Sequence, residues 1–138
     1  MNGEQIFWPM LCQVALTYLI YGVGSSRRMN AIKSGNAKPS DFRIPNIEPE
    51  PSATAMRNLA NQFELPVLFY ACCLTLFVLG ATSTVALALG WAFALLRVAH
   101  AYVHVTSNKL RYRRPLFISG FFVLAAMWLM VLYRLAIG

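Results

Sequence analysis

Charged residues are scarce in this sequence of 138 residues, and acidic ones most of all, with 5 Asp and Glu against 12 Lys and Arg. Only 12% of the chain is charged, whereas 58% is hydrophobic. A typical soluble domain has about twice this charged fraction, and a disordered segment needs low hydrophobicity and high charge. Neither class fits the composition. The length favours one domain rather than two.

Cysteine is also rare. Its three copies are Cys12, Cys72 and Cys73, and all three lie in apolar stretches. A secreted, disulfide-stapled fold needs an even set of cysteines at loop positions. The sequence therefore excludes a disulfide framework, and we expect small core residues at these positions.

Long hydrophobic stretches are abundant instead. A helix that spans a bilayer needs about 20 mostly apolar residues, and four stretches meet this requirement, roughly residues 5–24, 55–80, 84–105 and 116–137. Together they cover most of the chain. The sequence predicts an all-α fold, an integral membrane four-helix bundle that forms one transmembrane domain over residues 1–138.

The basic residues predict the orientation of these spans. The connection between the first two holds Arg27, Arg28, Lys33, Lys38 and Arg43. The connection between the last two holds Lys109, Arg111, Arg113 and Arg114. Basic loops remain in the cytoplasm, so we expect a multi-pass protein with both termini away from the cytoplasm. No nucleic-acid-reading motif accompanies these charges, which favours lipid headgroups or an anionic small molecule as partners.

Polar residues interrupt two of the predicted spans, and in each span they share one helix face. In the second span they are Arg57, Asn61 and Glu64, and in the third they are Arg97, His100 and His104. Such residues can simply hold helices together through hydrogen bonds. The clustering of so many of them beside basic loops favours a functional site instead.

Glu64 and Arg97 reach similar depths in antiparallel helices, roughly 15 Å and 12 Å from the cytoplasmic ends at ~1.5 Å per residue. Ionised side chains at such depth usually face the bundle interior and pair with one another. We therefore expect an ion pair between them inside a water-filled cavity that faces the cytoplasm. Pro66 removes a backbone donor inside the second helix, which frees the carbonyl of Gln62 and predicts a kink.

Other kinds of chemistry find less support. His100 and His104 have the i, i+4 spacing of metal ligands, and Glu64 could be a third ligand. Nearby arginines would repel a cation, so we expect no metal site. The sequence has no glycine-rich phosphate loop, Ser-His-Asp set or Cys-x-x-Cys pair.

Three parts of the sequence together resemble the membrane-associated proteins in eicosanoid and glutathione metabolism, the MAPEG family. They are the basic pair Arg27-Arg28, the pattern Arg-x-x-x-Asn-x-x-Glu at residues 57–64, and the run Arg-Val-Ala-His-Ala-Tyr-Val-His at residues 97–104. The resemblance covers nearly the whole chain. It implies a homotrimer of four-helix subunits that bind glutathione at their interfaces near the cytoplasmic face.

The resemblance also implies roles for individual residues. Those that match glutathione-binding positions are Arg57, Asn61, Glu64, Arg97, His100 and His104. An arginine just after the third helix and one at the end of the first are implicated in binding or activating the thiol. Here the candidates are Arg111 or Arg113 for the former, and Arg27 or Arg28 for the latter. The loop lengths leave both choices open.

We accordingly expect a membrane-bound glutathione transferase or peroxidase that acts on hydrophobic small molecules, with arginine stabilising the thiolate. The compact chain predicts a protein of the bacterial inner membrane. The alternative is a non-catalytic membrane scaffold or lipid- and anion-binding protein of the same fold. A small transporter or proton relay built on Glu64, His100 and His104 is less favoured, because four spans without a repeat offer little machinery for alternating access.

Overall fold

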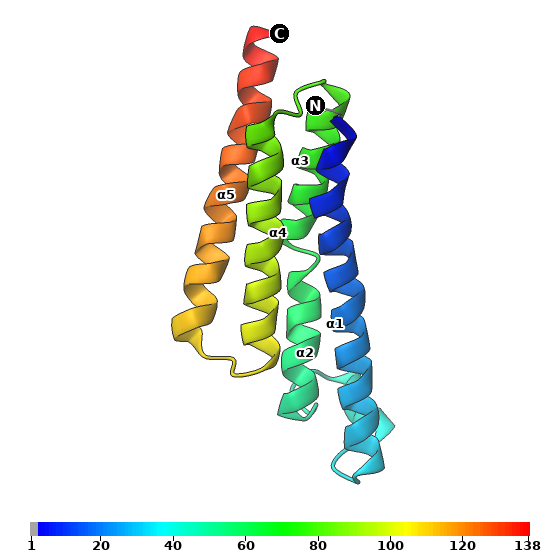
Figure 1. Cartoon of the computed structure of the whole chain (residues 1–138). Helices are drawn as coiled ribbons and strands as arrows, with labels where there is room; N and C mark the ends of the chain where they lie inside the picture. Colours follow the sequence, from blue (N-terminus) through cyan, green and yellow to red (C-terminus); the bar gives the residue numbers. More distant parts are fainter. Residues whose placement is uncertain (1–2) are drawn as a thin grey trace.

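The computed structural model describes residues 3–138 as helices joined by short connections (Figure 1). The elements are η1 (Gly3–Ile6), α1 (Phe7–Lys33), η2 (Pro39–Arg43), α2 (Glu50–Asn61), α3 (Leu65–Val78), α4 (Thr84–Val105) and α5 (Leu110–Ile137). The helices α2 and α3 follow one another as a single broken rod, so the fold has four rods in all. The start of α1 and the end of α5 lie at the same end of the bundle, and the connections before α2 and before α5 lie at the other.

The four rods confirm the predicted all-α fold with four spans. Each is long enough to cross a bilayer, and each has an apolar window with a mean hydropathy between 1.4 and 2.2. At ~1.5 Å per residue a bilayer core of about 30 Å needs about 20 residues, and the shortest rod has 22. The protein is therefore an integral, multi-pass membrane protein.

Three helices extend beyond the apolar stretches of the sequence. The helix α1 continues to Lys33, α2 already begins at Glu50, and α5 begins at Leu110. Hydropathy identifies only the part of a helix that lies in lipid. Because Lys and Arg are good helix formers, a helix can continue through basic residues into the headgroup region. At the start of α2 a proline occupies the first turn, where its missing N–H costs no hydrogen bond.

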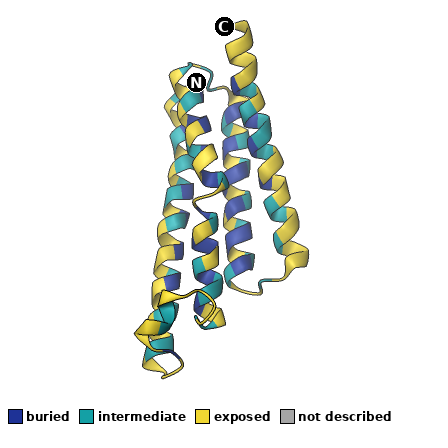
Figure 2. Ribbon diagram, turned by 180° about the vertical axis from the view of Figure 1, so that it is seen from behind, coloured by how far each residue is buried: buried dark blue, intermediate teal, exposed yellow. Residues whose placement is uncertain are grey.

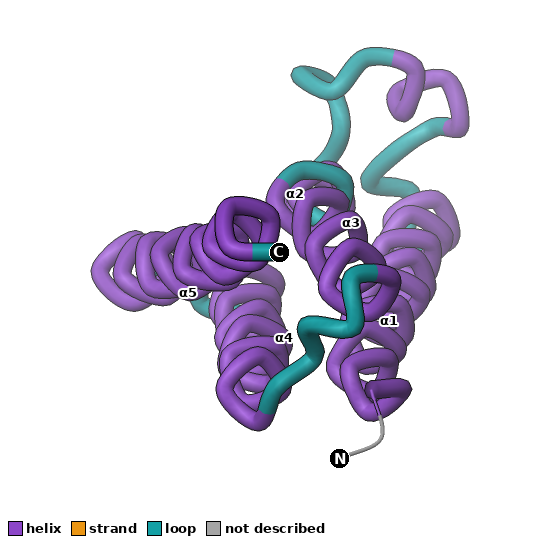
Figure 3. The backbone as a smooth tube through the Cα atoms, turned by 90° about the horizontal axis from the view of Figure 1, so that it is seen from above, coloured by secondary structure: helices purple, strands orange, loops and turns teal. Residues whose placement is uncertain are grey.

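The helix α4 is the central element of the bundle. Seen from above, it lies between α5 and α1, with α3 across the bundle from it (Figure 3). Its buried residues recur every three or four positions, and Figure 2 shows this buried stripe along the rod. They are Ala86, Gly90, Phe93, Ala94, Arg97, His100, Ala101 and His104. The stripe is apolar in its first half and polar in its second.

The main apolar core surrounds the first half of α4. The rings of Phe69 and Phe93 stack with their centroids 4.4 Å apart, and Met127 of α5 packs into the same cluster. Cys72 and Cys73 are fully buried there, which confirms the prediction of core cysteines for these two. Cys12 is only partly buried. A smaller apolar cluster lies toward the other end of the bundle.

Gly90 sets the spacing between α1 and α4. A Cβ atom at this position would lie 3.2 Å from Cγ of Pro9 and 3.4 Å from Cδ1 of Ile6. The proline ring is rigid and Ile6 is fully buried, so neither can move away cheaply. At Gly22 of α1, by contrast, a Cβ atom would meet nothing within 4 Å.

Gly90→Leu should therefore destabilise the bundle, by about 1 to 3 kcal/mol, the usual cost of overpacking a core. Gly22→Leu is the matched control, because it makes the same change where there is open space. Thermal unfolding in detergent should show a lower midpoint for G90L alone. Equal midpoints for the two variants would contradict this account of the α1–α4 contact.

Candidate functional site

The polar half of α4 places three predicted site residues on one buried face. Arg97, His100 and His104 are exposed by only 1%, 3% and 0%. The rings of the two histidines meet edge to face, with centroids 5.7 Å apart. This polar layer adjoins the smaller apolar cluster, which includes Ala101 of the same stretch of α4, and it is the least expected feature in a bundle that is otherwise hydrophobic.

A break in the second span faces this layer. The helix α2 ends at Asn61 and α3 begins at Leu65, with Pro66 in its first turn. Glu64, with φ −98° and ψ −108°, is outside the helical conformation. The kink predicted from Pro66 is thus a complete interruption, because the missing N–H of the proline lets the chain leave the helix just before it.

The break gives Arg97 its only hydrogen bond within residues 3–138. The guanidinium Nη2 donates to the backbone oxygen of Asn61 at 3.0 Å. The Nε and Nη1 groups of Arg97 are buried, and no partner for them is present in the described chain. Buried polar groups in folded proteins almost always have partners, so two donors of a buried cation are left for an acceptor that comes from outside this chain.

The predicted ion pair between Glu64 and Arg97 is wrong. No ion pair within 4.0 Å joins the two residues in the part of the chain that is described, although the charge of Glu64 acts on Arg97. The break turns Glu64 out of the helix and leaves it exposed. Only in one continuous helix would Glu64 have shared a face with Asn61.

A cavity of about 400 Å³ lies beside the break, between α4 and the start of α5. Its lining residues are Asn61, Glu64, His100, Leu110, Arg113, Arg114 and Phe117. The structure therefore brings four of the predicted site residues, from three separate helical segments, around one space. The cavity has a carboxylate, guanidinium groups, an amide and an imidazole, a mixture suited to a ligand with charges of both signs.

The structure separates the two arginines that follow the third span. Arg113 lines the cavity and donates a hydrogen bond of 2.6 Å from Nη1 to the side-chain oxygen of Asn108. Asn108 is at φ 50°, the left-handed conformation that asparagine tolerates well. Arg111 is exposed and lines a different hollow with Arg114. Only Arg113 of the pair is placed at the cavity.

The arginines at the end of α1 hold the connecting segments. Arg27 donates to the backbone oxygens of Pro51 and Val105, which ties α1 to the ends of α2 and α4. Arg28 donates two hydrogen bonds to the carboxylate of Glu48, from Nε at 2.7 Å and from Nη2 at 2.9 Å. Its guanidinium also lies over the ring of Phe42, 5.2 Å from the centroid. Neither Arg27 nor Arg28 lines the cavity of this chain.

Arg57 is the remaining residue of the predicted set, and it lies one turn before Asn61 on α2. Its side chain is exposed in the single chain. Its charge nevertheless reaches His104, as do those of Arg97 and Arg113. The charges of Arg97 and Arg113 also act on His100, whereas that of Arg57 acts on His104 alone of the two histidines.

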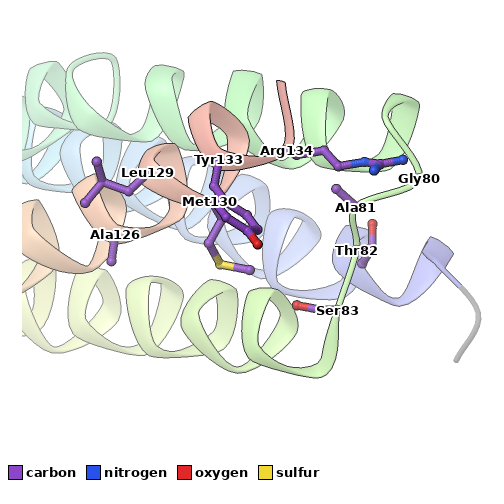
Figure 4. Close-up of a pocket in the computed structure, with 9 residues that line it drawn as sticks. All are labelled: Gly80, Ala81, Thr82, Ser83, Ala126, Leu129, Met130, Tyr133 and Arg134. Carbon is purple, nitrogen blue, oxygen red and sulfur yellow. The ribbon is translucent and has the colours of Figure 1, made fainter. Parts of the chain in front are cut away.

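A second, larger hollow lies at the opposite end of the bundle. It has about 680 Å³ and is formed by the turn at residues 80–83 and the end of α5 (Figure 4). The side chain of Arg134 extends toward Gly80 there. None of the predicted site residues lines this hollow, and its only charged lining residue is Arg134. The cavity beside the break in the second span therefore remains the candidate site.

The model of the MAPEG family matches residues 6–133. The chain belongs to the MAPEG family. This confirms the resemblance drawn from the Arg57, Arg97 and Arg27-Arg28 patterns. No curated protein and no solved structure matches the chain.

Two polar residues of this MAPEG chain were missed by the sequence argument. Asn58 and Gln62 are fully or almost fully buried, and Gln62 donates to Asn58 at 2.8 Å. Gln13 of α1 donates to Gln62 at 2.7 Å. The signal was present, since Asn58 and Gln62 are a pair of amides at i and i+4 in the second predicted span.

No metal centre is evident in the structure of this MAPEG chain. Within residues 3–138, no group of three or more His, Cys, Asp or Glu residues is close enough to hold an ion.

The Arg28–Glu48 pair predicts how stability depends on pH. Hydrogen bonding from Arg28 lowers the pKa of the Glu48 carboxyl below its usual value. A carboxyl with a lowered pKa stabilises the fold at pH values above its unfolded pKa, about 4.3, and this stabilisation is lost as pH falls through the folded value. Glu48→Gln should therefore cost about 1 kcal/mol at pH 7, as expected for a partly exposed pair, and should remove part of the loss seen in acid.

The matched control is Glu50→Gln, because Glu50 is exposed two residues further along. Thermal unfolding in detergent at pH 7 and at mildly acidic pH, below the usual glutamate pKa, provides the comparison. If E48Q and E50Q behave alike at both pH values, the ion pair does not stabilise the connection between α1 and α2.

Proposed function

We propose that this protein is a glutathione-dependent transferase or peroxidase that acts on lipophilic electrophiles or hydroperoxides. The observation that carries the proposal is the buried guanidinium of Arg97, whose Nε and Nη1 lack partners in the described residues. Arg97 does not itself line the cavity of mixed charge, but it is hydrogen-bonded to Asn61, which does. A buried cation that is not fully paired is costly. An anionic ligand that enters the cavity would remove that cost.

Glutathione fits the residues around the cavity. It has two carboxylates and one ammonium group, so its site needs several cations and at least one acidic acceptor. Arg97 and Arg57 are the candidates for the carboxylates, because a planar guanidinium can bind a carboxylate through two hydrogen bonds. Glu64 is the candidate for the ammonium group. Asn61 and His100 add neutral hydrogen-bonding groups from the same lining.

When bound, glutathione would supply a nucleophilic sulfur for attack on an electrophilic carbon or on a peroxide oxygen. The task of this chain's own residues is to hold that sulfur as a thiolate. Arg113 is the candidate, because it lines the cavity with its guanidinium held by Asn108. A neighbouring cation lowers the pKa of a thiol by about 1 to 3. Lipophilic partners would reach the site from the bilayer.

The proposal includes a homotrimer in which a neighbouring subunit completes each site. Arg57 and Glu64 are exposed in the single chain, which leaves charged groups free to meet a ligand or a second copy. Arg27, which is near the end of α1, could then act on the site of a neighbour. We also propose that the chain lies in a bacterial inner membrane with both termini away from the cytoplasm. This orientation is supported by the basic connections at one end of the bundle (Figure 1).

Arg113→Ala should reduce thiolate formation without a comparable loss of glutathione binding. Ultraviolet absorbance of the purified protein with glutathione near pH 7 measures the bound thiolate. The expected loss is about tenfold or more, because the pKa of the thiol would return toward its free value. Arg111→Ala is the matched control, since it removes the same charge from an exposed position away from the cavity.

An equal effect of R111A and R113A would contradict the assignment of Arg113. Bound glutathione that remains a thiol in the unmodified protein would instead favour the non-catalytic alternative, a scaffold or anion-binding protein of the same fold.

Glu64→Gln should weaken the binding of glutathione by about tenfold, because an ammonium group would lose a charged acceptor worth about 1.5 to 3 kcal/mol. Calorimetric titration of the detergent-solubilised protein gives the dissociation constant. Glu50→Gln makes the same change at an exposed position outside the cavity and should leave binding unchanged. Unaltered affinity in E64Q would remove Glu64 from the proposed site.

A further inference from the structure

A chain of buried side-chain hydrogen bonds crosses the bundle from α1 to α4. Gln13 donates to Gln62 at 2.7 Å, and Gln62 donates to Asn58 at 2.8 Å. Nδ2 of Asn58 then lies 3.1 Å from Nδ1 of His104. All four residues are at most 1% exposed. We call this chain the amide relay.

The order of donors in the amide relay determines which nitrogen of His104 has the proton. The side-chain oxygen of Asn58 accepts from Gln62, so the amino group of Asn58 faces the imidazole. That group can only donate, and Nδ1 of His104 must therefore be a bare acceptor. The ring is then neutral, with its proton on Nε2. If Nδ1 were protonated, its N–H and the amino group of Asn58 would face each other as two donors without an acceptor between them.

The other nitrogen of His104 is left without a partner. Nε2 is buried and has no hydrogen-bond partner among residues 3–138. The ring lies against that of His100, which lines the cavity. The positive charges of Arg57, Arg97 and Arg113 act on the ring. A donor in this environment is suited to an anionic acceptor.

We propose that Gln13, Gln62 and Asn58 are positioning residues that hold His104 as its neutral Nε2–H tautomer, and that this N–H donates to an anionic group of the bound ligand. The tautomer depends only on the amide relay. The identity of the acceptor, a carboxylate or thiolate of glutathione, rests on the proposed function. The amide relay thus connects α1, the break in the second span and α4 to a single proton at the site.

The tautomer can be measured without any ligand. The sequence has only 2 histidines, so ¹⁵N NMR of histidine-labelled protein in lipid nanodiscs gives four ring-nitrogen signals, and H104Q identifies those of His104. A bare Nδ1 and a protonated Nε2 are expected. A protonated Nδ1 in the unmodified protein would overturn the proposal.

Asn58→Asp tests whether the relay sets the tautomer. The substitution keeps the shape and the acceptor for Gln62 but replaces the donor with an oxygen, and the three surrounding arginines favour its ionised form. The Nδ1 signal of His104 should shift to the position of a protonated nitrogen. Asn46→Asp, in the exposed connection before α2, is the control and should leave the signal unchanged. An unshifted signal in N58D would overturn the proposal.

Gln62→Leu tests the relay one step further away, because Gln62 forms no hydrogen bond with His104 in the described structure. Asn58 would lose the donor that fixes its amide, so the Nδ1 signal should move part of the way toward its position in N58D. A signal identical to that of the unmodified protein would show that Gln62 has no positioning role. Either variant alone keeps the proposal testable if the other does not fold.

Titration with glutathione separates this inference from the proposed function. A shift of the His104 Nε2 signal that saturates with the calorimetric binding curve supports the donor role. Binding without that shift overturns the donor role and leaves the proposed function intact. If glutathione does not bind, the proposed function fails and the donor role fails with it, whereas the tautomer result stands by itself.

Discussion

The burial of one guanidinium group, that of Arg97, is the constraint on which the rest of the polar layer depends. A charged side chain inside a membrane bundle is tolerated only if other groups satisfy it. The chain meets part of this requirement by interrupting its second span, so that the backbone oxygen of Asn61 accepts from Arg97. The same interruption turns Glu64 toward the cavity. A single backbone irregularity therefore provides both the acceptor for the buried cation and the carboxylate of the candidate site.

The polar layer costs stability that the apolar parts of the bundle must offset. Phe69, Phe93 and their neighbours form a packed cluster toward one end of the bundle, and a smaller cluster that includes Ala101 packs beside the polar residues. Amide groups buried in such a layer are acceptable only when nearly all their hydrogen bonds are formed. The relay from Gln13 to His104 satisfies this condition at every step except its two ends. In the polar layer the groups that remain unpaired are on Arg97, His100 and His104 of the central helix α4 and on Gln13 of α1.

Much of this architecture could be predicted from the sequence, because hydropathy and helical periodicity are local properties. The four spans, the buried cysteines and the polar faces of two helices follow directly from the spacing of apolar and polar residues. One cavity is lined by Asn61, Glu64, His100 and Arg113, which come from different helical segments. From the sequence, this meeting of separate segments was implied only by the family resemblance.

One expectation was wrong and two choices were left open, because sequence patterns report ideal helices and not their breaks or ends. Glu64 was expected to pair with Arg97 because a continuous helix would have placed it there, but the break before Pro66 turned it away. The choice between Arg111 and Arg113 depended on where α5 begins, and hydropathy does not detect a helix start among basic residues. The family resemblance offered Arg28 as a candidate for the thiol, whereas in the structure Arg28 pairs with Glu48. Its partner comes from a connection whose path is decided by tertiary packing.

The central claim is that an anionic ligand completes the environment of Arg97. Electron cryomicroscopy of the protein in lipid nanodiscs with saturating glutathione tests this claim most directly. The account predicts a glutathione carboxylate within hydrogen-bonding distance of both Nε and Nη1 of Arg97, with the rest of the molecule in the cavity beside Glu64 and Arg113. Glutathione bound elsewhere, or a neighbouring subunit's side chain occupying those two donors, would contradict it.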